Sequence, residues 1–176
     1  AVFAEDALNL TPDWLLAGGV RLDEFELDRS VLNVTAGTTQ KYGQDYDAVS
    51  WRGSTVYSVT PRTQLFAQYT RAVTPVSGLL FMSSGNATFD LTTGYSYEGG
   101  IKTSLTGNRV ELTASVFRIR QDDILTRDPA NAAIVVQGGN LQSQGLELAL
   151  SLPATDELTL ALSGTWLEAE YGQLIE

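Results

Sequence analysis

The side chains best suited to chemistry in this sequence are carboxylates. They gather in two groups: the pair Asp122 and Asp123, and the cluster Asp23, Glu24, Glu26 and Asp28. Paired carboxylates can act as a general acid and base, and a cluster can bind Ca²⁺. Carboxylates at the ends of strands, near water, also have a simpler interpretation, because they mark where an apolar stretch stops. We adopt that interpretation and expect neither a catalytic residue nor a metal site.

Two residue types are absent, and their absence narrows the chemistry further. The sequence contains no His and no Cys. This excludes Ser-His-Asp and Cys-His nucleophilic systems, zinc sites of the ordinary type and thiol redox chemistry. An enzyme built on this chain would have to use carboxylates, Lys or Tyr alone. We therefore expect no enzyme and no cofactor.

The overall composition is acidic and moderately apolar. There are 21 acidic and 11 basic side chains, for a net charge of −10, and no basic cluster that would bind phosphates, so nucleic acid is not expected as a partner. A hydrophobic content of 43% argues against disorder. No apolar run approaches the ~18 residues of a membrane-spanning helix. Ala1 is not followed by a signal-type segment, which indicates mature sequence or an excised segment.

Alternation of apolar and polar residues recurs from end to end, which is typical of β-strands with one apolar face. In the clearest example Leu146, Leu148, Leu150 and Leu152 alternate with Glu147, Ala149 and Ser151. The same alternation is found in residues 16–22, 97–105, 110–116 and 158–166. Phe117 and Ile119 interrupt the pattern, and we expect a bulge or a change of face near Val116.

Short turns and long connections alternate along the chain. Turn signals begin at residues 11, 60, 106 and 153, about 47 residues apart. Longer polar connections are predicted at residues 30–47, 74–94 and 128–140. The fold class is therefore all-β, an antiparallel up-and-down meander of about eight strands with short turns at one edge and long connections at the other.

The apolar face of the predicted strands has a nearly constant length from one strand to the next. Following each short turn, the first charge on that face is Glu24, Arg71, Arg118 or Glu168, after roughly 9 to 13 residues, against the ~9–11 that a transmembrane strand needs. Aromatic residues lie near both ends of this band, as in aromatic girdles: Trp14 and Tyr57 at one end, and Tyr69, Tyr95, Trp166 and Tyr171 at the other. The opposite parity carries charges of both signs, which predicts a polar lumen. These features favour a transmembrane β-barrel wall over a soluble sandwich.

Several segments, in this order, resemble the C-terminal part of the barrel of TonB-dependent outer-membrane receptors, in particular the ferric-siderophore subgroup. They are FAEDAL (3–8), WLLAGGVRL (14–22), LFAQYT (65–70), YEGGIK (97–102), VFRIRQDDILTRDPAN (116–131), QGLEL (144–148) and AEY (169–171). The resemblance implies a barrel of about 22 strands, a plug domain inside it, and a short box that engages TonB. It also implies a location in the bacterial outer membrane.

Eight strands cannot close so wide a pore, so we expect residues 1–176 to be part of such a barrel domain, without the plug and the final strands. By the resemblance, the partners are a ferric siderophore or similar metal chelate, the TonB complex through the missing N-terminal part, and outer-membrane lipid. The long connections would form the ligand mouth. Their candidate contacts with a chelate are Tyr42, Tyr46, Phe81 and Met82.

Two other classes of protein remain open at this point. One is a self-contained eight-stranded outer-membrane barrel with an adhesion, anchoring or small-pore role. The other is a soluble lipocalin-like barrel that binds an apolar ligand.

Overall fold

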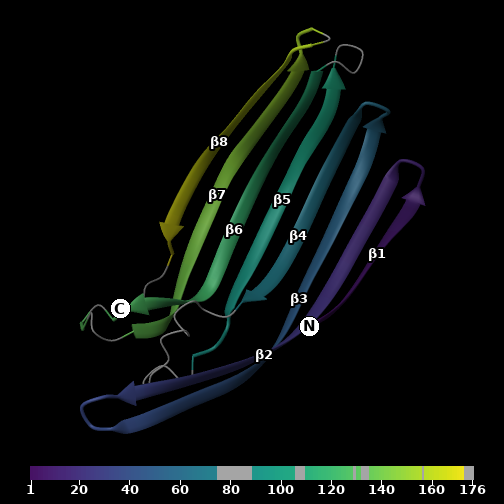
Figure 1. The fold of residues 1–176 in the computed structure, drawn as a ribbon. Coiled ribbons are helices and arrows are strands. Elements are labelled where there is room, and N and C mark those ends of the chain that lie inside the picture. The colour runs from purple at the N-terminus through teal and green to yellow at the C-terminus, as the bar shows by residue number, and fades with distance from the viewer. Residues whose placement is uncertain (75–88, 106–109, 129, 132–134, 156, 173–176) are drawn as a thin grey trace.

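The fold is a single antiparallel sheet, seen in a computed structural model that describes residues 1–74, 89–105, 110–128, 130–131, 135–155 and 157–172 (Figure 1). Its eight strands pair strictly in chain order. They are β1 (Val2–Thr11), β2 (Trp14–Asn33), β3 (Thr38–Thr60), β4 (Thr63–Thr74), β5 (Thr92–Leu105), β6 (Val110–Arg127), β7 (Val135–Pro153) and β8 (Thr159–Tyr171). The predicted all-β meander is confirmed.

The sheet is open at both sides. In the described part of the chain β1 pairs with β2 and β8 with β7, and the two outermost strands do not pair with each other. The eight strands therefore form a curved wall rather than a closed barrel (Figure 1). Among the described residues no helix is both long and apolar enough to cross a membrane.

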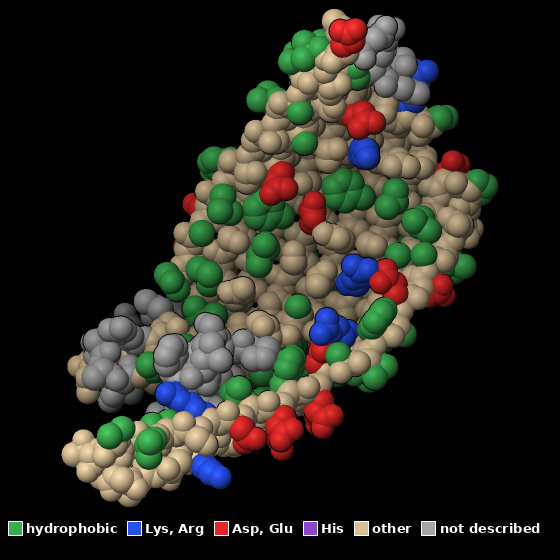
Figure 2. All heavy atoms as spheres, viewed as in Figure 1, with side chains coloured by type: hydrophobic (Ala, Val, Ile, Leu, Met, Phe, Trp, Pro, Cys, Tyr) green, Lys and Arg blue, Asp and Glu red, His purple; other side chains and the backbone are tan. Residues whose placement is uncertain are grey.

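The register places the two residue parities on opposite faces of one continuous sheet. On the first face Leu112 is opposite Leu150, which in turn is opposite Leu162. We call this face, which also carries Val20 and Leu65, the apolar face. The other is the polar face, which carries Arg52, Glu98, Lys102, Glu111 and Glu147 (Figure 2). The predicted alternation is thus continuous across all eight strands.

The register places two of the four predicted band ends on one row. Arg118, Gln144 and Glu168 are direct neighbours across β6, β7 and β8, whereas Arg71 lies one row further out and Glu24 three rows further out. Tyr69 and Tyr97 lie in the row of Arg118 and Trp51 lies in the row of Arg71; their three rings pack in sequence at tilted angles, with both centroid distances at 4.7 Å. At the opposite end of the band, at the short turns, Trp14 packs edge-on against Tyr57. The one misplaced girdle residue is Tyr171, which is paired with Leu141 and lies on the polar parity.

The first long connection is much shorter than predicted. Residues 30–47 were expected to form a loop, but β2 continues to Asn33 and β3 begins at Thr38. Only residues 34–37 turn, with the side chain of Asn33 accepting hydrogen bonds from the N–H groups of Thr35 and Ala36, and with Gly37 at a φ of 64°. The β2–β3 hairpin therefore projects beyond the other strands and bends beneath their ends in Figure 1.

The irregularity expected near Val116 occurs instead at Asp123. Pairing of β5 with β6 is regular from Val110 to Asp122, and the shift in register surrounds Asp123, whose φ is 61°. Phe117 needs no bulge, because its ring lies over Gly145 on the polar face. Phe66 covers Gly100 in the same way. An aromatic ring laid over a cross-strand glycine covers backbone that would otherwise be bare.

This packing predicts that Gly145→Val lowers the free energy of unfolding by about 1–3 kcal/mol. A Cβ at this position would collide with the carbonyl oxygen of Trp166 and would lie 2.8 Å from the Phe117 ring. Gly53→Val is the matched control, since a Cβ at Gly53 meets nothing within 4 Å. Urea unfolding in detergent micelles, followed by tryptophan fluorescence, measures both. Equal loss in the two variants would contradict this account of Gly145.

Candidate functional site

The buried cluster of the described residues lies at the long-connection end of the sheet, beyond the apolar band. Tyr46, Ala48 and Leu91 are buried there. Five partly buried side chains from β2, β3, β4 and the segment before β5 pack against them: Phe25, Leu27, Tyr42, Val73 and Phe89. Burial of these groups explains why the β2–β3 hairpin continues as strand and bends toward β5. The hairpin and the end of the β4–β5 connection therefore form one packed unit.

Tyr46 joins the two parts of this unit. Its hydroxyl donates a 2.6 Å hydrogen bond to the carbonyl oxygen of Phe89, and only 9% of the residue is exposed. Burial and, to a smaller degree, the negative charge of Asp90 raise the pKa of Tyr46 above its ordinary value of 10.0. The neutral phenol, which is the hydrogen-bond donor, is thus favoured in the folded state.

A second set of hydrogen bonds ties the β4–β5 connection to β6 and β7. The Gln137 side chain accepts from the N–H of Asp90 at 2.7 Å and donates to the carbonyl oxygen of Asp90 at 2.8 Å. Its amide also donates to the carbonyl oxygen of Asp123, which accepts a further bond from the Thr92 hydroxyl. Gln137 therefore holds the residues before β5 against the bulge in β6. Together with the Tyr46–Phe89 bond, these contacts fix the β2–β3 hairpin, the residues before β5 and the adjoining ends of β6 and β7 relative to one another.

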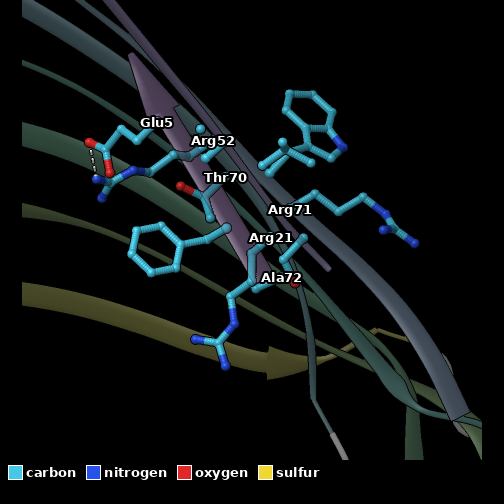
Figure 3. A pocket seen from close by; sticks show the side chains of 12 residues that line it. Glu5, Arg21, Arg52, Thr70, Arg71 and Ala72 are labelled. Atoms are coloured by element: carbon cyan, nitrogen blue, oxygen red, sulfur yellow. Dashed lines mark hydrogen bonds and ion pairs between the residues drawn. The ribbon is translucent and has the colours of Figure 1, made fainter. Parts of the chain in front are cut away.

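The polar face carries a separate hollow of about 390 Å³ over β1 to β4 (Figure 3). Arg52 forms an ion pair with Glu5 at its edge. The Nε of Arg21 donates to both carboxylate oxygens of Asp23, at 2.9 and 2.8 Å, and a terminal nitrogen of Arg21 lies 2.8 Å from Oδ1. These charges are neutralised in pairs along the wall, which suits a polar lumen.

Tyr42 and Tyr46 are brought together on one face of β3, four residues apart, within the packed unit. The Tyr42 hydroxyl donates to Gln40 at 2.7 Å, so neither tyrosine extends freely into solvent. The other two candidate contacts, Phe81 and Met82, lie outside the described residues.

The two carboxylate groups do not form a metal centre in the described ranges, where no set of three or more potential ligands converges. Asp122 pairs with Arg120 at 2.7 Å, while neighbouring Asp123 occupies the bulge. On the hairpin, Glu24 faces Asp47 and Glu26 faces Asp45. These carboxylates form an acidic ladder on the side of the hairpin that continues the apolar face.

Sequence reasoning missed Gln137, Asp90 and the bulge at Asp123 as organising residues. Their contacts are to backbone groups of segments 14 to 47 positions away in sequence. A glutamine in a polar connection has no local signature for such a role. The apolar residues Phe25 and Leu27 were the available signal, because they alternate with the carboxylates of residues 24–28, just before the connection predicted at residues 30–47.

Comparison with known proteins identifies the family. The family described as TonB dependent receptor-like, beta-barrel, matches residues 1–174. The metal-pseudopaline receptor CntO of Pseudomonas aeruginosa is 27% identical over 172 residues, covering 97% of this chain and 24% of the receptor. The crystal structure of the siderophore receptor PiuA from Acinetobacter baumannii has a TM-score of 0.82 at 24% identity, covering 96% of this chain and 25% of that one. The closed form of the ferric-catecholate import receptor Fiu of Escherichia coli K12 has a TM-score of 0.80 at 21% identity, covering 97% and 27%.

An open antiparallel wall with an apolar outer band, two aromatic girdles and a charged inner face defines a segment of a bacterial outer-membrane β-barrel. The chain belongs to the TonB-dependent receptor β-barrel family. Proteins of this family are receptors and transporters of the outer membrane, and the chain spans about a quarter of the length of the curated relatives it matches.

The raised pKa of Tyr46 predicts a pH dependence of stability. The folded state holds the phenol proton more tightly than the unfolded state does. The contribution of Tyr46 to the free energy of unfolding is therefore complete below pH 10 and is lost as pH rises through the folded-state pKa. Tyr46→Phe removes the titrating group but keeps the ring. Phenolate absorbance is followed as the pH is raised in the wild type and in Tyr46→Phe. The tyrosine titration that the variant lacks should have a pKa above 10.0. If the missing titration instead has a pKa at or below that value, the raised pKa of Tyr46 is contradicted.

Proposed function

We propose that this chain is a wall segment of an outer-membrane receptor that imports ferric siderophores or similar metal chelates, and that the parent protein works with TonB. The proposal is supported by family membership and by the names of relatives, which include receptors for metal-pseudopaline and for ferrioxamine B. Short turns would face the periplasm and long connections the cell exterior, as in other bacterial barrels.

The observation that carries the proposal is the packed unit at the long-connection end. A plain barrel wall needs only the band of paired strands that crosses the hydrocarbon. Here β2 and β3 extend well beyond it and pack through Tyr46 against the residues that precede β5. A braced structure above the membrane on the outer side suits a ligand mouth, because binding residues are commonly held on loops by a rigid scaffold.

Within this mouth we propose Tyr42, Tyr46, Phe81 and Met82 as ligand-site residues, with unequal roles. Tyr42, on the outer part of the hairpin, would contact the chelate through its ring. Tyr46, whose hydroxyl bonds Phe89, would position the hairpin. The roles of Phe81 and Met82 rest on the sequence alone.

We also propose that residues 1–176 are one continuous part of the barrel domain, with the plug and the TonB-engaging segment supplied elsewhere in the parent protein. The segment would do no covalent chemistry on its cargo, because import requires only binding, release and a path through the lumen. The open edges at β1 and β8 would pair with the neighbouring strands of the complete barrel, since unpaired backbone groups are not stable in lipid.

Uptake of radioactive iron tests this function in cells that express the full-length parent. Ferrichrome, ferrioxamine B and a ferric catecholate are the probes. At least one should accumulate, and accumulation should stop when TonB is removed. For the probe that is taken up, Tyr42→Ala should weaken binding roughly fivefold or more, as truncating an aromatic contact does. Tyr57→Ala, at the short-turn end, is the matched control and should leave affinity unchanged.

Two results would overturn the proposal. One is uptake that does not depend on TonB, because the parent would then be a passive pore. The other is failure of every probe to bind a parent protein that is folded by its migration on unboiled gels. Equal affinity for wild type and Tyr42→Ala would remove only the residue assignment and leave the import function standing.

A further inference from the structure

Three arginines lie together on the apolar face, in the same two rows as the rings of the aromatic girdle. Arg71 on β4 and Arg120 on β6 are both register partners of Tyr95 on β5, and so lie in one row. Arg118 is opposite Tyr97 in the adjoining row, which is the first polar row of the band. We call Arg71, Arg118 and Arg120 the arginine patch.

The patch lies on the side of the sheet away from the lumen. Figure 3 shows Arg71 pointing away from Arg21 and Arg52, which lie over the hollow on the polar face. With a spacing of about 4.8 Å between strands, Arg71 and Arg120 are separated by roughly 10 Å across β5. The three guanidinium groups thus surround Tyr95 and Tyr97 at the height where hydrocarbon ends.

Each guanidinium is held in place while keeping donors to spare. Arg71 bonds the carbonyl oxygen of Val49, Arg118 bonds the Gln142 side chain at 2.7 Å, and Arg120 bonds Asp122. A guanidinium has five N–H donors, and these bonds use only some of them. Arg118 and Arg120 are exposed, and Arg71 is half-buried.

The charge of this region differs from that on the β8 side. Over β4 to β6 the two rows carry the three arginines together with Tyr69, Tyr95 and Tyr97, and the carboxylate of Asp122 lies one row further out. Toward β8 the rows continue with Glu168 and Glu170, whereas toward β2 they continue with uncharged residues such as Trp51 and Val20. The net positive patch is therefore bounded by acidic groups on its β8 side. This pattern would attract an anion to β4–β6 and repel it from β8.

We propose that the arginine patch binds the phosphate group of an anionic lipid in the outer leaflet. Guanidinium groups bind phosphate through paired N–H donors, and the amides of Gln142 and Gln144 add further donors beside Arg118. The acyl chains of the same lipid would lie along the apolar band, and the rings of Trp51, Tyr69 and Tyr97, which share the rows of the arginines, would flank its headgroup region. A free phosphate would gain only the first of these contacts, and this favours the lipid.

A binding titration on the full-length receptor in neutral detergent tests the proposal. The probe is fluorescent phosphatidic acid, with fluorescent phosphatidylcholine as the reference. The wild type should bind phosphatidic acid saturably and in preference to phosphatidylcholine. Arg118→Gln and Arg120→Gln should each weaken binding about fivefold, the usual effect of one arginine near a charged lipid surface. The triple variant, which adds Arg71→Gln, should lose the preference.

The matched control is Lys102→Gln, which removes the same charge from the exposed polar face. It should leave the affinity for phosphatidic acid unchanged. Equal weakening by Lys102→Gln would overturn the proposal, because net charge alone would then explain the binding. Complete displacement by millimolar inorganic phosphate would also overturn it, in favour of a soluble phosphate. Unboiled gel migration verifies that each variant is folded, so unchanged binding in folded arginine variants counts against the patch.

Discussion

The structure depends on one constraint, which is that every backbone N–H and C=O crossing hydrocarbon must be paired with a neighbouring strand. The ladder from β1 to β8 meets it without interruption across the apolar band. Shifts of register occur at the short turns, near Thr11 and Thr60, and around Asp123 at the other end. In the described chain the positive φ values at Gly37, Asp123 and Gly138 also lie beyond the band. Irregular backbone is thus confined to regions where water can form the hydrogen bonds that a neighbouring strand does not provide.

The same constraint separates the tasks of the two faces. Strands that cannot bend within the band must present every second residue to lipid, so that face is leucine-rich and ends in aromatic rings and arginines. The other face is free to carry charge, and its ion pairs include Glu5 with Arg52 and Arg21 with Asp23. Beyond the band the strands no longer face lipid, so they need not keep this strict alternation. The β2–β3 hairpin then bends, and its apolar side covers Leu91 while its acidic side faces away.

Sequence alone predicted what depends on local pattern. Alternation at Leu146, Leu148 and Leu150, together with turn signals such as Thr60-Pro61, predicted the strands and their two faces. It failed where the deciding contact is distant. The hairpin continues as strand because Tyr46 packs near Leu91, and no bulge is needed near Val116 because Phe117 is accommodated over Gly145. Neither partner is near in sequence, and Gln137 carries no local mark of its role in joining two connections.

Accessibility of alternate positions on one strand tests the central claim most directly. Spin labels would be placed singly at Glu147 and Leu148 of β7 in the full-length receptor reconstituted in lipid. The register puts these neighbours on opposite faces of the sheet. The label at Leu148 should contact dissolved oxygen in the hydrocarbon, and the label at Glu147 should contact a water-soluble reagent in the lumen. The reverse pattern, or water contact at both positions, would contradict the account.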